Sequence, residues 1–225
     1  ALMAFGLRKF LFGGDARQPE NLPSSVKQAL ASWRASPPPE LDEQHFHMRY
    51  LVIDVTTSGP RADEDELLGI SAVALRGGSV IATDSFALDF AADEAKGVAV
   101  DSQLTAFLTY AAKAPLVTYH VPFVSGFLER AYKERLAVDF QPQWIDLAWL
   151  LPSLFKDKSA TVRPLDEWLE AFAIGGDQRR DTMENTLVLA RLFQMVLARA
   201  NDQEILTAEK LIEESKSASF LRRNS

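Results

Sequence analysis

The sequence lacks cysteine altogether, and this absence excludes disulfide frameworks and thiolate metal sites. A chain without cysteine suits a reducing compartment, so we expect a cytoplasmic protein. A long apolar run is also missing. The N-terminal stretch "ALMAFGLRKFLFGG" is too short to span a membrane and lacks the ordered basic, apolar and small-residue regions of a signal peptide. We therefore expect no membrane span.

The sequence has fewer basic than acidic residues, with 24 Lys and Arg against 31 Asp and Glu. Its formal net charge is −7. Affinity for duplex nucleic acid comes mainly from lysines and arginines that neutralise phosphates, so the net charge argues against broad charge-driven binding to a duplex. A small site with its own metals is not excluded. The common enzyme motifs are also absent: there is no P-loop, no G-x-S-x-G elbow, no H-E-x-x-H and no G-x-G-x-x-G.

Residues 1–49 are predicted to form a helical appendage. The phrase "SSVKQALASWR" starts with serine, an N-cap residue, and places Val26, Leu30 and Trp33 at helical spacing before "SPPPE" ends the helix. We expect this helix to pack on the main domain. For the apolar N-terminal segment around Arg8 and Lys9, the alternative is that it docks on a partner or on a membrane surface.

Residues 50–200 are predicted to form one α/β domain. Three β-rich runs open it, "YLVIDV", "LLGISAVAL" and "SVIATDSFAL", and the glycines of "RGG" between the last two indicate a hairpin. Helical patterns then alternate with a short apolar run, "PLVTY", and a long amphipathic stretch closes the domain at "DTMENTLVLARLFQMVLARA". This order predicts a mixed sheet, three antiparallel strands and then parallel pairing, flanked by helices. Residues 201–225 should add a helix up to about Ser215 and a flexible tail.

The order of elements resembles ribonuclease H-like domains, and three phrases resemble the DnaQ-like (DEDDh) 3′-5′ exonuclease family within it. The first family motif is a strand ending D-x-E-T-T-G, and the chain reads "DVTTSG" there. Asp54, Thr57 and Gly59 match, whereas Thr56 stands in the place of the family glutamate.

The second and third motifs resemble the family in their apolar positions and differ in their polar ones. "VTYHVPFVSGFL" is similar to V-A-H-N-x-x-F-D-x-x-F-L, with His120 in the asparagine place and Val124 in the place of the catalytic aspartate. "RDTMENTLVLA" is similar to H-x-A-x-x-D-A-x-x-T-A, with Arg180 for the histidine and Asn185 for the last aspartate. The resemblance thus retains one of five catalytic residues, Asp54.

The resemblance implies hydrolysis of a terminal phosphodiester by two divalent metals about 4 Å apart, held by four carboxylates, with a histidine as base. Magnesium prefers hard oxygen ligands, usually carboxylates, and an arginine cannot act as a general base. With Asp54 alone left, we expect two-metal occupancy to fail and the domain to act by binding a protein partner or, weakly, a single-stranded nucleic-acid end. No cofactor is then needed.

The alternative is an active 3′-5′ exonuclease with Mg²⁺ or Mn²⁺ in a rearranged site, which requires additional carboxylates near Asp54. Asp146, Asp181 and Glu184 are the nearest candidates by motif, with 63–66 in the loop after the first strand. Each also has a structural interpretation, as a helix start, an N-cap or a solvated turn. The candidate side chains are Asp54, Thr56, His120, Val124, Asp146, Arg180, Asp181, Glu184 and Asn185.

Overall fold

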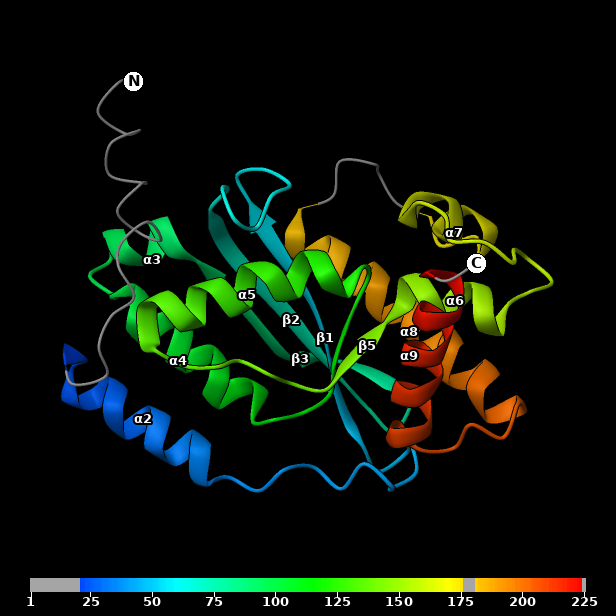
Figure 1. The fold of residues 1–225 in the computed structure, drawn as a ribbon, viewed down its shortest axis with the longest axis horizontal. Coiled ribbons are helices and arrows are strands. Elements are labelled where there is room, and N and C mark those ends of the chain that lie inside the picture. Colours follow the sequence, from blue (N-terminus) through cyan, green and yellow to red (C-terminus); the bar gives the residue numbers. More distant parts are fainter. Residues whose placement is uncertain (1–20, 176–180, 224–225) are drawn as a thin grey trace.

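The computed structural model describes residues 21–175 and 181–223, which form a five-stranded sheet flanked by helices (Figure 1). The strand order is β3-β2-β1-β4-β5. The antiparallel strands are β1 (Arg49–Thr57), β2 (Leu67–Arg76) and β3 (Ser79–Asp89); β4 (Leu116–Thr118) and β5 (Trp144–Asp146) follow and run parallel to β1. The predicted α/β class and mixed sheet are therefore confirmed.

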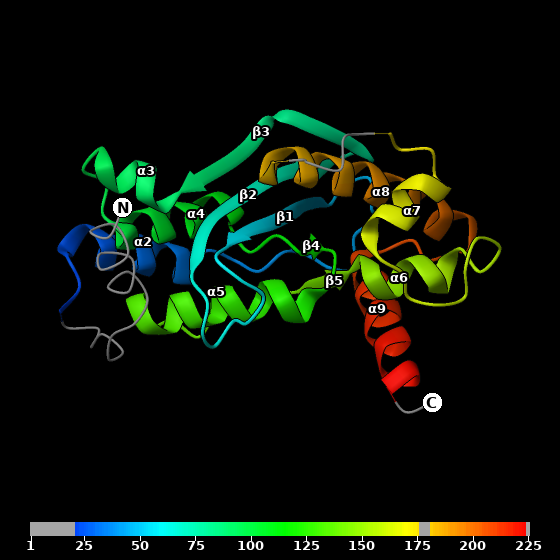
Figure 2. The same ribbon diagram turned by 90° about the horizontal axis from the view of Figure 1, so that it is seen from above.

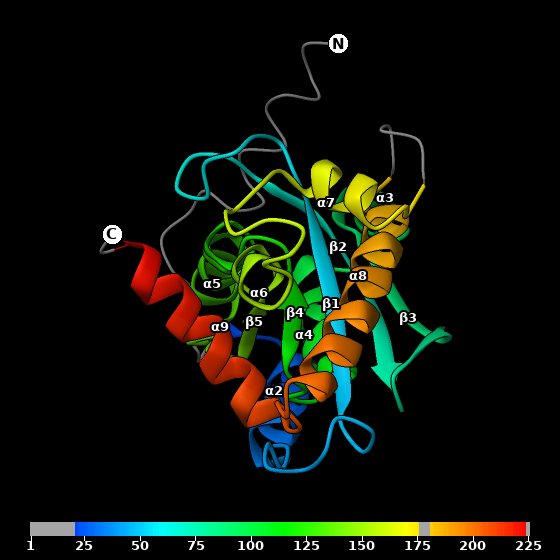
Figure 3. The same cartoon turned by 90° about the vertical axis from the view of Figure 1, so that its right-hand side faces the viewer.

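Alternation along β1 separates the core into two layers, one on each face of the sheet. Leu51, Ile53 and Val55 pack in one apolar cluster, whereas Tyr50 and Val52 pack in the other. The first layer holds α2 (Ser24–Ala35), α4 (Val100–Ala111) and α5 (Val121–Leu136). The second holds α6 (Leu147–Leu154), α7 (Leu165–Ala171), α8 (Thr182–Asp202) and α9 (Ala208–Arg223); α3 (Phe90–Ala95) follows β3 (Figures 2 and 3).

The N-terminal helix packs on the domain, as expected, with Val26 and Leu30 fully buried. It has Pro23 rather than a serine at its N-cap position, so the predicted serine cap is wrong. At its other end the Lys113 ammonium donates to the carbonyls of Arg34 and Ser36, an arrangement that caps the helix C-terminus with a positive charge. The apolar tip with Arg8 and Lys9 lies outside the described residues.

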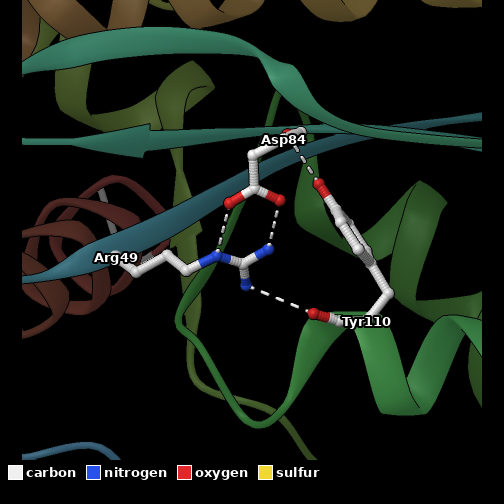
Figure 4. A network of polar contacts seen from close by, with 3 residues as sticks. All are labelled: Arg49, Asp84 and Tyr110. Atoms are coloured by element: carbon white, nitrogen blue, oxygen red, sulfur yellow. Dashed lines mark hydrogen bonds and ion pairs between the residues drawn. The ribbon is translucent and has the colours of Figure 1, made fainter.

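A bulge in β3 is held by a polar network that joins three elements (Figure 4). Val73 and Ala74 pair with Ser85 and Ile81, so residues 82–84 leave the ladder. Arg49 of β1 donates to both carboxylate oxygens of Asp84, at 3.1 and 3.0 Å, and the Tyr110 hydroxyl donates to the Asp84 carbonyl. The bulge interrupts the free edge of the sheet, which limits pairing with other chains.

Two segments differ from the sequence-based expectation. The stretch "QWIDLAWLLPSLF" has a mainly helical pattern, and residues 147–154 do form α6, but residues 144–146 form β5 before it. The last helix continues beyond Ser215 to Arg223, in place of a flexible tail. Ser215 and Ala218 are buried there, so tertiary packing extends a helix whose sequence has only moderate helix propensity. No helix in the described ranges is long and apolar enough to cross a membrane.

Candidate functional site

Asp54 lies near the carboxyl end of β1 and faces α8. Its neighbours Ile53 and Val55 point into the opposite layer, and the carboxylate Oδ2 accepts a hydrogen bond of 2.6 Å from the amide nitrogen Nδ2 of Asn185. Burial raises the pKa of Asp54, and the hydrogen bonds from the Asn185 amide and the Val55 backbone partly counteract this shift. The structure thus brings together two of the residues that the motifs single out.

A set of hydroxyl groups completes the surroundings of this pair. Thr56, two residues along β1, shares a hydrogen bond with the Thr182 hydroxyl at the start of α8. Ser71, which pairs with Asp54 across the sheet, donates to the Thr182 carbonyl at 3.0 Å and contacts the Thr186 hydroxyl. We call Asp54, Thr56, Ser71, Thr182, Asn185 and Thr186 the Asp54 cluster. Asp54 is its only member that ionises.

The sequence motifs did not identify Ser71, Thr182 or Thr186. Ser71 and Thr186 are 3% and 0% exposed, so both hydroxyls must find partners inside the protein. The signal was present in the sequence, because Ser71 interrupts the apolar run of β2 and Thr186 immediately precedes an apolar run of α8. Such isolated hydroxyls indicate a buried polar contact.

Val124 lies in the first turns of α5 and is 1% exposed. It packs with Ile53 and Val55 in the apolar cluster of the other layer, so an aliphatic side chain fills the position that the motif assigns to a catalytic aspartate. Arg180 lies outside the described residues.

Asp146, a candidate for a replacement ligand, holds the start of two helices. Its carboxylate accepts hydrogen bonds from the backbone N–H groups of His120, Val121 and Ala148, at 2.9, 2.9 and 3.0 Å. Burial raises the pKa of Asp146, while these three donors lower it. His120 precedes α5 in the left-handed region, with φ 67°, and its side chain is exposed. Asp146 therefore fixes an unusual backbone turn and caps α6.

The two candidates on α8 form a capping box. Glu184 N–H donates to the Asp181 carboxylate at 2.8 Å, and Asp181 N–H donates to the Glu184 carboxylate at 3.0 Å. In the loop after β1, Asp65 accepts from the Arg61 backbone and Arg61 pairs with Glu64. Within the described ranges, no three His, Asp or Glu side chains form a group that could hold a metal ion.

The two histidines just before β1, His45 and His47, belong to no metal-binding group within the described ranges. Both ring nitrogens of His45 have hydrogen-bond partners, the Tyr50 hydroxyl and the Ile205 carbonyl. Burial lowers the pKa of His45, which favours the neutral ring that this arrangement needs, one nitrogen accepting and the other donating. His45 thus ties the segment before β1 to the loop between α8 and α9.

Solved nuclease structures share this fold. E. coli exonuclease I in complex with a dT13 oligonucleotide gives a TM-score of 0.52 at 14% identity, with 70% of this chain and 42% of that chain covered. Cell-death related nuclease 4 (CRN-4) gives 0.54 at 13% identity, with 69% and 66% covered. The chain thus spans about two fifths of the length of exonuclease I. No protein-family model matches, and no curated protein does either. The predicted ribonuclease H-like, exonuclease-type fold is confirmed.

Proposed function

We propose that this domain keeps the exonuclease fold without the exonuclease chemistry and acts by binding. The observation that carries the proposal is the Asp54 cluster itself. At the three described positions where the family has acids besides Asp54, the chain has two neutral polar side chains, Thr56 and Asn185, and the buried Val124. Thr56 and Asn185 form hydrogen bonds within the cluster, and Val124 packs in the apolar core.

The charge of this cluster does not fit two divalent cations. Two such ions carry four positive charges, and the cluster offers one carboxylate. The Asn185 amide, moreover, donates to Asp54 Oδ2, so its hydrogens occupy a lone pair that a cation would use. The replacement ligands that the motifs offer are Asp146, Asp181 and Glu184, and backbone N–H groups at helix starts already donate to these carboxylates. The residues present therefore do not fit a two-metal site.

The binding role is proposed for a protein partner or for a single-stranded nucleic-acid end. The net charge of −7 favours a contact that does not depend on extended phosphate neutralisation. E. coli exonuclease I has been solved in complex with a dT13 oligonucleotide, and the shared fold supports a test with single strands.

A nuclease assay tests the loss of activity. Purified protein is incubated with single-stranded DNA and RNA in Mg²⁺ or Mn²⁺, beside Asp54→Ala and a control, Asp42→Ala, which removes an exposed acid before β1 that no motif singles out. We expect no turnover above background and no difference among the three proteins. Metal-dependent turnover that Asp54→Ala abolishes and Asp42→Ala preserves would contradict the proposal and support the rearranged metal site.

A further inference from the structure

A pocket of about 350 Å³ opens between α9 and the edge of the sheet, and none of its lining residues belongs to the Asp54 cluster. Its walls come from the start of α5, from β5, from α6 and from α9, which lie together in Figures 1 and 3. Sites for small molecules have volumes of roughly 300–1,000 Å³, so this pocket is large enough for one compact ligand.

Three aromatic side chains from three different elements line the pocket. They are Trp144 of β5, Trp149 of α6 and Phe220 of α9, and Phe220 is 68% exposed. Flat π-surfaces of this kind stack on the faces of nucleobases whatever the base sequence. The walls therefore suit a planar aromatic group.

Among the side chains that the structure describes, the cation that lines the pocket is Lys216. It is exposed and lies one helical turn before Phe220, so the two side chains share a face of α9. The start of α5 cannot serve an anion in its place, because the N–H groups of His120 and Val121 donate to Asp146 and Pro122 has none. A phosphate attached to the planar group would therefore depend on the Lys216 ammonium.

A hydroxyl group at the inner end of the pocket adds a hydrogen-bonding position. The Ser215 oxygen accepts from the Asp146 backbone N–H at 3.0 Å, and Ser215 also lines the pocket. Because a hydroxyl both accepts and donates, its hydrogen remains available to an acceptor atom on the edge of a base.

The surroundings favour a small ligand over a protein partner. A stable protein interface buries about 800 Å² on each partner. Among the described residues, the large apolar side chains that are exposed lie on separate elements, and only Phe220 of them lines this pocket. Among the described side chains, the pocket wall thus offers one large exposed apolar group, which suits a small ligand better than a protein partner.

We propose that this pocket binds a nucleobase with its attached phosphate, as a free nucleotide or as one unit of a single strand. The base stacks between the aromatic walls and the phosphate pairs with Lys216. The choice of a nucleotide as the ligand rests on the proposed function. Binding in the pocket itself involves no hydrolysis.

The test is a titration of the purified chain with dAMP, deoxyadenosine and a short deoxyadenosine oligonucleotide, followed by quenching of tryptophan fluorescence and by calorimetry. We expect saturable binding of dAMP, weaker binding of deoxyadenosine, and a loss of about tenfold or more in affinity for dAMP in Phe220→Ala, the scale of one lost stacking contact. Lys216→Ala should reduce the affinity for dAMP to that for deoxyadenosine. Tighter binding of the oligonucleotide than of dAMP identifies a strand as the source, and equal binding identifies the free nucleotide.

Two variants serve as matched controls. Phe46→Ala removes a phenyl group with the same 68% exposure elsewhere, and Lys210→Ala removes another exposed lysine of α9. Both should bind dAMP as the parent does. The proposal is overturned if millimolar dAMP gives no saturable signal, or if Phe220→Ala and Lys216→Ala bind like their controls. Because no hydrolysis is measured, failure here leaves the nuclease result intact, and turnover in the nuclease assay leaves this binding result intact.

Discussion

The Asp54–Asn185 contact places a partly buried carboxylate against a neutral donor. Burial of this charge lowers the free energy of unfolding by a measurable amount. Burial raises the pKa of Asp54 in the folded state, so the folded protein holds this proton more tightly than the unfolded chain. Stability from this group is present at low pH and is lost as the pH rises from the usual carboxyl range through the raised pKa. At neutral pH the ionised carboxylate therefore destabilises the fold.

Substitutions at the pair should separate the charge from the hydrogen bond. Asp54→Asn removes the charge while its carbonyl can still accept from Asn185, so we expect higher stability than the parent at pH 7 and a smaller gain as the pH falls towards 4. Asn185→Ala removes the donor and should cost about 1–3 kcal/mol at pH 7, and less when combined with Asp54→Asn. Urea denaturation at both pH values measures these differences. Equal stability of Asp54→Asn and the parent at every pH would refute the claim that the ionised Asp54 carboxylate destabilises the fold.

At the scale of single residues, the motifs predicted Asp54 as a candidate site residue but not the side chains that surround it. A strand-end carboxylate followed by Thr56 could be placed by motif alone. The partners of Asp54 depend on the register between β1 and β2 and on the rotation of α8, which set Ser71 and Asn185 beside it. The register and the helix rotation are features of the tertiary structure, and no local sequence pattern predicts them.

At the scale of elements, Asp146 joins β5 to the starts of α5 and α6. We expect Asp146→Ala to cost about 3 kcal/mol, since it leaves buried backbone N–H groups without acceptors and releases the left-handed turn at His120. The matched variant Asp181→Ala removes an exposed N-cap of α8 and should cost about 1 kcal/mol. Urea denaturation compares the free energies of unfolding of the two variants. If Asp146→Ala loses no more stability than Asp181→Ala, the structural role that we assign to Asp146 is contradicted.

Element prediction succeeded where a pattern extends over many residues. The hairpin of β2 and β3 and the amphipathic α8 were predicted from alternation, glycines and helical spacing. β5 was missed because its three residues run directly into α6, which leaves too few positions to show alternation. The bulge at 82–84 was also missed, because it depends on Asp84 reaching Arg49 and Tyr110 from another strand and a helix.

At the scale of the whole molecule, the fold should accept the missing ligands at a cost in stability. A variant with Thr56→Glu, Val124→Asp, Arg180→His and Asn185→Asp restores four carboxylates and a base at the motif positions. Its unfolding temperature should fall, because like charges crowd together beside Asp54 and one acid replaces a buried valine. Added Mn²⁺ should recover part of the loss by binding the folded state only. A variant that folds but gains nothing from Mn²⁺ would mean that the second and third motifs are misaligned.

Whether the unmodified domain retains a metal site is answered most directly by titrating it with Mn²⁺ in a calorimeter, beside Asp54→Ala. One carboxylate bonded to an asparagine amide should bind no ion at sub-millimolar concentration, so we predict identical, featureless traces for the two proteins. Saturable binding of Mn²⁺ by the parent, with two ions per chain and loss of both in Asp54→Ala, would contradict the proposal that the domain lacks the two-metal site.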